Sequence, residues 1–174
     1  MILHSVSHGA EHGGEPIVFL GSIASTTDMW LPQLDALSAG HHVIALDHRG
    51  HGLSPDPDVA PGETTFDDLA DDVLSTLDSL GVDRFHVVGL SLGGAIAQYL
   101  ALTSPRVISA AFLCTAAYFG GPEKWHPRAE LTRAQGLEPM ADGVIDFWLT
   151  KDFQESHPAT TAAYRRMVTS TRGV

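Results

Sequence analysis

The chain has 174 residues, of which 44% are hydrophobic and 18% are charged, so it is long enough to form one globular domain with a sizeable core. This composition excludes an intrinsically disordered chain. The formal net charge of −11 repels phosphate backbones and anionic lipid surfaces, which argues against nucleic-acid and membrane partners.

Signals for membrane insertion or secretion do not stand out in the sequence. Apolar runs stay below the roughly 18 residues of a membrane span, and the first residues lack the pattern of a signal peptide. Cys114 is the single cysteine and lies in the apolar run 110–114, which predicts a small buried side chain. A chain without an internal disulfide suits a reducing compartment, so we expect a cytoplasmic protein.

Short β-branched and aliphatic runs alternate with longer amphipathic stretches, which is typical of an α/β fold with a mostly parallel sheet flanked by helices. These runs predict an edge strand at 2–6 and buried strands at 17–20, 43–46, 85–89 and 108–114.

One amphipathic helix is predicted between the second and third buried strands. Thr65 followed by Asp68 is a start signal for this helix, and Gly81 is a stop signal. Its apolar residues recur at spacings of three and four, which places them on one face: Phe66, Leu69, Val73, Leu77 and Leu80.

The last third of the chain shows helical periods without a strand, and we expect Pro127, Pro139 and Pro158 to break it into separate helices. The charge changes at the same point. Residues 1–120 contain 14 acidic and 3 basic residues, whereas residues 121–174 contain 7 of each. We therefore expect an α/β core over 1–120 and a helical cap over 121–174.

The segment Gly89-Leu-Ser91-Leu-Gly93 comes directly after a predicted strand and just before the helical run 95–102. A serine nucleophile must project its hydroxyl from a sharp strand-to-helix turn, and small residues two positions on either side are needed to fit such a turn. The alternative is an ordinary tight turn, but the strand and helix on either side favour catalysis. Ser91 is therefore the predicted nucleophile.

Backbone amides near Ser91 are predicted to stabilise a developing oxyanion. One is the amide of Leu92, at the start of the following helix, and the other is the amide of Ile23, in the loop after the first buried strand. Asp47 and His51 lie in the glycine-containing loop after the next strand. We interpret both as structural, because side chains that brace such a loop outnumber catalytic ones.

Three motifs stand out in the first part of the chain: Met29-Trp30 with Gln33, Asp47-His-Arg-Gly-His-Gly-Leu-Ser54 and Gly89-Leu-Ser-Leu-Gly-Gly94. Together they resemble the α/β-hydrolase superfamily. The later motifs are Leu113-Cys-Thr-Ala-Ala117, Pro122-Glu-Lys-Trp125 with Arg128, Ala134-Gln-Gly-Leu137, Phe147-Trp148, Phe153, His157-Pro158 and Arg166-Met167 with Thr171. These are similar to the 3-oxoadipate enol-lactonases, and the resemblance covers essentially the whole chain.

The resemblance implies hydrolysis of the enol-lactone of 3-oxoadipate in bacterial breakdown of aromatic compounds, through an acyl-enzyme and without a metal or organic cofactor. Because this substrate carries a free carboxylate, an acidic protein needs local cations to hold it, and Lys124, Arg128 and Arg133 are close together in the cap. Arg128 could instead be a solvated surface residue. Trp125 and Trp148 are expected either to wall the substrate pocket or to pack the cap against the core.

A serine nucleophile needs a histidine base and an acid that orients the histidine. In this fold the acid and then the histidine follow on strands beyond the cap. The residues present do not fit these roles: His157 before Pro158 is expected at a helix boundary, and Asp142, Asp146 and Asp152 on the polar face of the cap.

We therefore expect the acid, the histidine and the last strands of the sheet to come from a missing C-terminal segment, a second chain or a partner subunit. The 174 residues alone are then expected to be close to inactive. Two other hypotheses stay open. One is a carboxylesterase, perhydrolase or carbon–carbon bond hydrolase with the same turn around Ser91. The other is a non-catalytic binding protein or an inactive shortened product.

Overall fold

The computed structural model describes residues 1–172, and within them the chain forms a five-stranded sheet with the order β1-β3-β2-β4-β5. β1 is antiparallel to β3, and the other neighbours are parallel. The mostly parallel sheet expected from the sequence is confirmed. The strands are β1 (Ser5–His8), β2 (Ile17–Leu20), β3 (Val43–Leu46), β4 (Phe85–Leu90) and β5 (Val107–Leu113).

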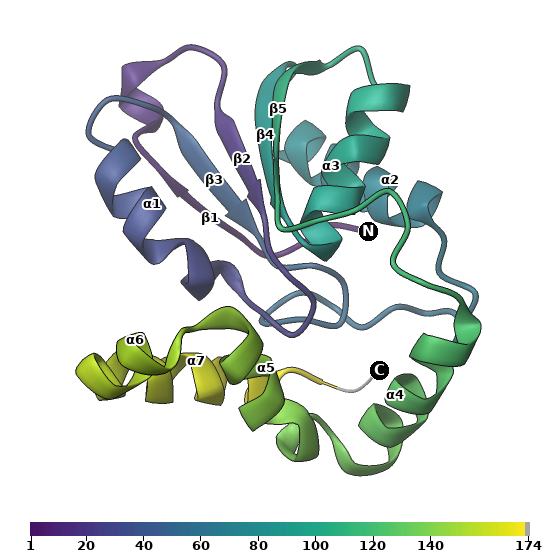
Figure 1. Cartoon of the computed structure of the whole chain (residues 1–174). Coiled ribbons are helices and arrows are strands. Elements are labelled where there is room, and N and C mark those ends of the chain that lie inside the picture. The colour runs from purple at the N-terminus through teal and green to yellow at the C-terminus, as the bar shows by residue number, and fades with distance from the viewer. Residues whose placement is uncertain (173–174) are drawn as a thin grey trace.

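Helices cover both faces of this sheet, with α1 (Leu31–Leu37) on one face and α2 (Phe66–Ser79) and α3 (Leu92–Thr103) on the other (Figure 1). Successive side chains of β2 point to opposite faces of the sheet, so they pack alternately against the helices on the two sides. Val18 and Leu20 join the cluster under α2 and α3, whereas Phe19 packs with Trp30 and Leu34 on the α1 side. A strand that is buried on both faces has to be apolar throughout, which explains why the sequence of β2 is a continuous hydrophobic run.

The predicted helix start at Thr65 is a complete capping box. The Thr65 hydroxyl accepts from the Asp68 amide, and the Asp68 carboxylate accepts from the Thr65 amide at 2.8 Å. Gly81, just past the end of α2, has a φ of 70°. Both boundary signals were therefore interpreted correctly, because they act within a few residues of chain.

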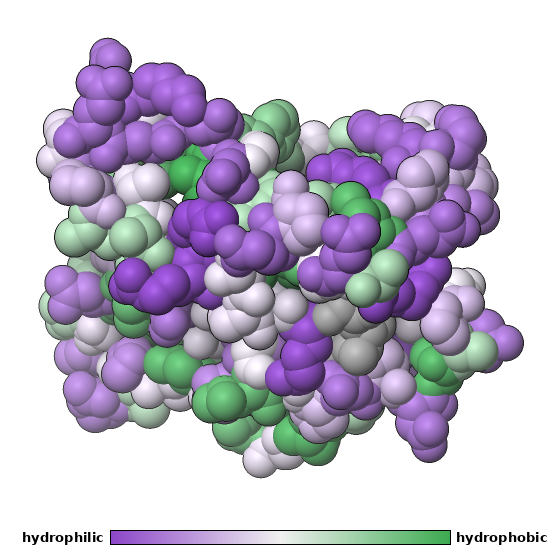
Figure 2. All heavy atoms as spheres, turned by 90° about the horizontal axis from the view of Figure 1, so that it is seen from below, coloured by the Kyte–Doolittle hydropathy of each residue, from purple (hydrophilic) through white to green (hydrophobic). Residues whose placement is uncertain are grey.

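From residue 122 onwards, the described elements are helices: α4 (Pro122–Gln135), the 3-10 helix η3 (Glu138–Met140), α5 (Ala141–Trp148), α6 (Lys151–Ser156) and α7 (Pro158–Ser170). They lie beneath the carboxyl ends of the parallel strands (Figure 1). Their shared cluster includes Ile145 and Val168 and also encloses Ala24 of the core. Seen from below, the cap is mostly polar, with apolar residues in small groups (Figure 2).

Two sequence-based expectations about these elements are wrong. The edge strand begins at Ser5 rather than at residue 2, because the Leu3 amide donates to the Thr76 hydroxyl at 2.8 Å and Leu3 is drawn into the core. Pro127 does not break the chain but lies inside α4. It has no amide to donate to the carbonyl of Glu123, and α4 continues through it without that hydrogen bond.

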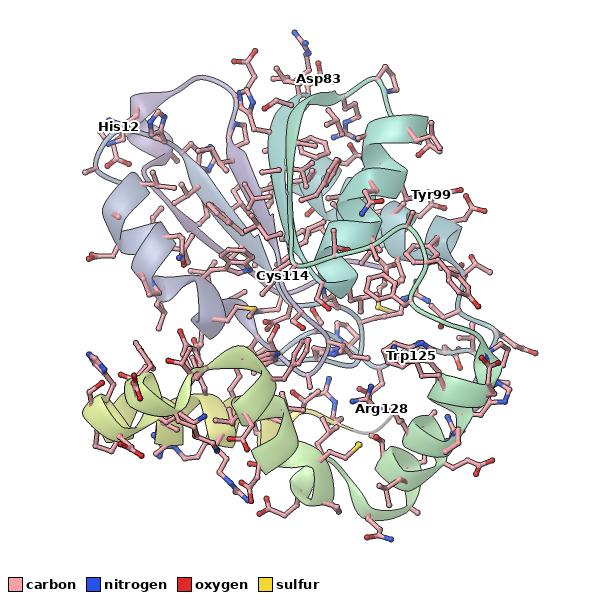
Figure 3. The ribbon with its side chains drawn as sticks, in the orientation of Figure 1. His12, Asp83, Tyr99, Cys114, Trp125 and Arg128 are labelled. Atoms are coloured by element: carbon pink, nitrogen blue, oxygen red, sulfur yellow. The ribbon has the colours of Figure 1, made fainter. Side chains whose placement is uncertain are left out.

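The expectation that Cys114 is buried is also wrong, since its side chain is exposed. Cys114 follows β5, which is an outer strand of the described sheet (Figure 3). The side chains along the second half of β5 are exposed too, with Phe112 at 47% and Leu113 at 40%. An apolar run predicts burial only where another element covers it.

Within residues 1–172 no helix is both long and apolar enough to cross a bilayer.

Candidate active site

Ser91 is the single residue between β4 and α3, and it has a φ of 54° and a ψ of −112°. A positive φ is costly for a residue with a side chain, by roughly 1–3 kcal/mol, and persists only where the surroundings enforce it. Here the Ser91 amide donates to the carbonyl of Leu113 at 2.9 Å, and the Thr115 hydroxyl donates to the Ser91 carbonyl at 2.8 Å. The last residue of β5 and Thr115, two residues further on, therefore hold the strained turn through its amide and its carbonyl.

Two glycines make this turn sterically feasible. A Cβ on Gly89 would lie 2.2 Å from the carbonyl oxygen of Gly93, and a Cβ on Gly93 would lie 2.2 Å from the carbonyl oxygen of Leu20. The close approach also allows the Gly93 amide to donate to the Gly21 carbonyl at 3.0 Å. The turn that carries Ser91 is thus pressed directly against the end of β2.

Ile23 and Leu92, whose backbone amides are the predicted oxyanion donors, line the same cavity as Ser91. Leu92 is the first residue of α3, where helix amides have no intrahelical acceptor. In the loop after β2, the Ser22 amide approaches the Met29 sulfur at 3.4 Å and the Ala24 amide donates to His51. Within residues 1–172, the amides of Ile23 and Leu92 donate to no protein acceptor.

A cavity of about 270 Å³ brings the main candidate residues together. It is lined by Ile23, Ser91, Leu92, Phe119 and Trp125. Sequence reasoning missed Phe119, which lies in the irregular segment between β5 and α4, where no periodic pattern signals a role. Its carbonyl accepts from the Trp125 indole at 3.1 Å, so the backbone of this segment holds the tryptophan over the cavity.

Cations flank the wall of the cavity that Trp125 forms. The Arg128 guanidinium lies 5.2 Å from the centre of the indole ring and the Lys124 ammonium 5.7 Å, both within cation–π range. Figure 3 shows Trp125 and Arg128 reaching from α4 towards the core. Arg133 is exposed further along α4, and Trp148 packs against the cap cluster, so neither lines the cavity.

The loop after β3 braces the site, as expected. Asp47 is buried, and its carboxylate accepts from the amides of Thr27 and Leu53 at 2.7 and 3.0 Å. It also lies 2.8 Å from the Nδ1 atom of His4. One carboxylate thereby ties together the first strand region, the loop after β2 and its own loop. The structural interpretation of Asp47 is confirmed.

His48, in the same loop, is buried and donates from Nε2 to the Gly21 carbonyl at 2.9 Å. The pKa of His48 is lowered to about 4, mainly by burial and also by the neighbouring His51, against smaller opposing effects of the Gly21 carbonyl and nearby carboxylates. His48 is therefore neutral at pH 7 and keeps a hydrogen-bond donor under the end of β2.

The remaining histidine and acid candidates lie where the sequence predicted. His157 joins α6 to α7 and is exposed, and Asp142, Asp146 and Asp152 are exposed on the cap. Within residues 1–172, no histidine hydrogen-bonds to the Ser91 hydroxyl.

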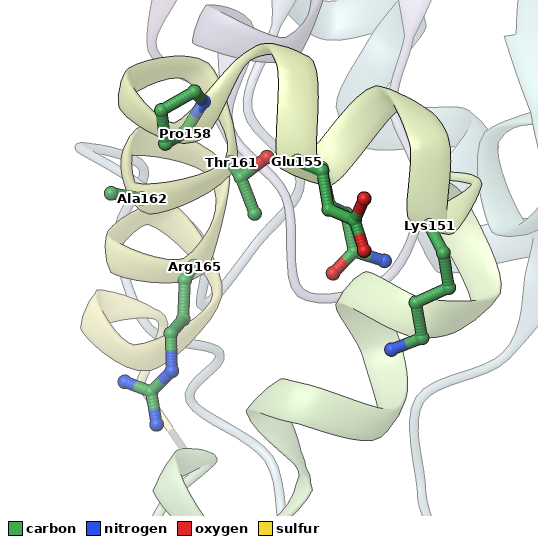
Figure 4. A pocket seen from close by; sticks show the side chains of 7 residues that line it. Lys151, Glu155, Pro158, Thr161, Ala162 and Arg165 are labelled. Carbon is green, nitrogen blue, oxygen red and sulfur yellow. The ribbon is translucent and has the colours of Figure 1, made fainter.

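A second hollow, on α6 and α7, shares no residue with the Ser91 cavity (Figure 4). It is an open surface lined by residues that include Lys151, Glu155 and Arg165. Both of its cations are paired: Lys151 with Asp146, and Arg165 with Glu138 and Asp142. Both of its positive charges are therefore already paired with carboxylates of the cap.

Comparison with known proteins agrees with this geometry. The family described as alpha/beta hydrolase fold matches residues 15–145, and the chain belongs to that family. It is 34% identical over 143 residues to 3-oxoadipate enol-lactonase 2 of Acinetobacter baylyi, covering 82% of this chain and 52% of that protein. The chain thus spans about half the length of this curated relative.

Solved structures show the same likeness. The enol-lactonase from Burkholderia xenovorans LB400 superposes with a TM-score of 0.91 at 37% identity, covering 98% of this chain and 65% of that one. Est816, described as an N-acyl homoserine lactone degrading enzyme, superposes with a TM-score of 0.76 at 31% identity, covering 95% and 61%. Both the α/β-hydrolase fold and the resemblance to enol-lactonases are confirmed.

The glycine contacts predict a large effect of Gly93→Ala. The added Cβ meets the backbone of β2 at 2.2 Å, so we expect a loss of about 1–3 kcal/mol or more in the free energy of unfolding, measured by urea denaturation. Gly143→Ala is the matched control, because nothing lies within 4 Å of its added Cβ in α5, and it should stabilise the protein by up to about 1 kcal/mol. Equal effects would contradict the close approach.

The burial of His48 predicts acid-sensitive stability. Its pKa falls from 6.5 in the unfolded chain to about 4 in the folded protein. The stabilisation from neutral His48 is complete above pH 6.5 and is lost as the pH falls towards 4, up to about 3 kcal/mol. Urea midpoints across this range should decline less steeply in His48→Gln than in the wild type or in the surface control His86→Gln. An unchanged slope in His48→Gln would refute the assignment.

Proposed function

We propose that the protein is a serine hydrolase that acts on a carboxylic ester or lactone through an acyl-enzyme on Ser91. The observation that carries this proposal is that one cavity is lined by Ser91, at a φ of 54°, and by Ile23 and Leu92, whose amides donate to no protein acceptor within residues 1–172. In this proposal the strained turn presents the hydroxyl, and the two amides donate to a carbonyl oxygen as negative charge develops on it.

In the proposed reaction the Ser91 oxygen bonds to the carbonyl carbon and its proton passes to a base. Collapse of the tetrahedral intermediate breaks the ester carbon–oxygen bond, and the same proton is returned to the leaving oxygen. Water then releases the acyl group by the reverse sequence. The histidine and acid that this sequence requires are assigned to a polypeptide segment or chain outside these 174 residues. The mechanism calls for no metal or organic cofactor.

The proposed substrate is a lactone that carries a carboxylate, specifically the enol-lactone of 3-oxoadipate. Two lines support it: relatives and neighbours bear that activity in their names, and Lys124 and Arg128 flank the Trp125 wall of the cavity. In a chain of net charge −11, such cations provide a local site for an anionic group. Trp125 and Phe119 would hold the ring.

A neutral carboxylic ester is the second candidate. The cavity walls other than Ser91 are apolar side chains, namely Ile23, Leu92, Phe119 and Trp125. Arg128 is exposed, so its charge is also available to solvent. If the acyl group alone determined recognition, neutral esters of suitable size would bind equally well.

Replacing the nucleophile tests the reaction class. In the full-length protein, Ser91→Ala should lower kcat for the enol-lactone by at least about a thousandfold, because the acyl-enzyme cannot form. Labelling with a serine-directed fluorophosphonate should disappear as well. Retention of full turnover by this variant would refute the proposal, and absence of labelling in the wild type would favour a binding protein.

Replacing one cation tests the substrate class. Arg128→Gln should raise KM for the enol-lactone about tenfold, as expected for the loss of one charged hydrogen bond, and leave a neutral aryl ester unaffected. Arg133→Gln is the matched control, since Arg133 lies on the same helix but away from the cavity, and it should change neither. A wild-type preference for neutral esters, with no effect of Arg128→Gln, would support the carboxylesterase.

A further inference from the structure

His51 hydrogen-bonds on both sides of its ring, and the partners fix its protonation. Nδ1 lies 2.9 Å from the carbonyl oxygen of Arg49, which can only accept, so Nδ1 carries the proton. Nε2 lies 3.1 Å from the amide of Ala24, which can only donate, so Nε2 carries the lone pair. The contacts therefore require a neutral imidazole in one tautomer.

The residue that His51 holds is adjacent to the proposed oxyanion donor. Ala24 has a φ of 63°, a conformation that a residue with a side chain adopts only under constraint. Its methyl group is buried against the cap residues Ile145 and Val168. His51 thus holds the amide of a strained residue whose side chain the cap encloses.

The preceding peptide group is held as well. The Ser22 carbonyl accepts from the Ser25 hydroxyl at 2.7 Å and from the Ser25 amide at 3.3 Å. In a trans peptide, the carbonyl and the next amide point in opposite directions, so this carbonyl directs the Ile23 amide away from Ser25. Ser25 and His51 therefore restrain the peptide groups on the two sides of Ile23.

Burial keeps His51 in the required form, because it is the main cause that lowers the pKa of His51 below its ordinary value of 6.5. The Arg49 carbonyl and Asp47 oppose this shift, and Arg172 adds a smaller lowering effect. Arg172 follows α7 and donates to the carbonyls of Gly52 and Ser54 at 2.9 and 2.5 Å, so the end of the cap holds this loop. The other titratable neighbour is His48, with ring centres 5.9 Å apart.

We propose that His51 is a positioning residue for the oxyanion hole: its neutral ring accepts from the Ala24 amide and thereby holds the Ile23 amide towards the Ser91 cavity. This inference rests on the proposed function, because the direction of the Ile23 amide matters to turnover only if Ser91 attacks a carbonyl. It goes beyond the proposed function because it assigns to His51, in the loop after β3, a role in stabilising the transition state.

The kinetic test compares His51→Ala with His51→Gln in the full-length protein. Loss of an acceptor should let the Ile23 amide turn away, so His51→Ala is expected to lower kcat for the enol-lactone by 10- to 100-fold and to change KM less than threefold. The amide oxygen of glutamine can accept from Ala24, so His51→Gln should recover most of kcat. His86→Ala, on the sheet away from the cavity, is the matched control, and rates are normalised to the folded fraction.

The pH dependence separates positioning from general destabilisation. Protonation of His51 removes the acceptor, so the acid limb of log(kcat/KM) should be steeper in the wild type than in His51→Gln, which does not titrate there. Identical acid limbs, or a kcat of His51→Ala equal to that of the wild type, would overturn the proposal. A loss that appears only as reduced stability, with normal kcat per folded molecule, would overturn it too.

A spectroscopic test does not depend on activity. Nitrogen-15 NMR should show His51 with its proton on Nδ1, and the amide signals of Ala24 and Ile23 should shift together as His51 titrates. If Ser91→Ala stays active while these signals co-titrate, the proposed function fails and the hydrogen-bonded arrangement stands. If Ser91→Ala is inactive but the amide signals are insensitive to His51, the positioning role fails alone.

Discussion

The site depends on the contact between the start of α3 and the end of β2. Gly93 has no side chain, so its backbone can lie against Leu20 and its amide can donate to Gly21 at 3.0 Å. This contact places the turn that carries Ser91 beside the loop that carries Ile23. A methyl group at Gly93 would push the turn that carries Ser91 away from the loop that carries Ile23, so the arrangement of these two residues depends on a steric constraint.

The loop after β3 turns that contact into a defined geometry. Asp47 fixes the amide of Thr27, His48 fixes the carbonyl of Gly21, and His51 fixes the amide of Ala24. Each bond joins residues at least 20 positions apart in sequence. Buried polar groups that are hydrogen-bonded specify one backbone arrangement, so these three bonds hold the segment after β2, from which Ile23 lines the cavity.

The cap contributes Trp125 to the cavity, whereas other apolar residues of the cap pack with one another. Trp125 is held at the cavity by a hydrogen bond to Phe119, and Trp148 packs with the cap cluster around Ala24. Both tryptophans were candidates for the pocket wall, and the structure brings only Trp125 to it. The position of a cap aromatic thus depends on the path of the irregular segment after β5, which carries no periodic signal.

The sequence alone determined the features that depend on neighbouring residues: the alternation of strands and helices, the capping box at Thr65, and the glycines around Ser91. These signals are local, and their physics acts within a turn or a strand. Only the tertiary structure decided the exposure of Cys114, the part of Phe119 in the cavity and the acceptor role of His51, because each depends on which distant segment lies against it. The residue type determines which interactions a side chain can make, and the packing of distant segments determines which partners it contacts.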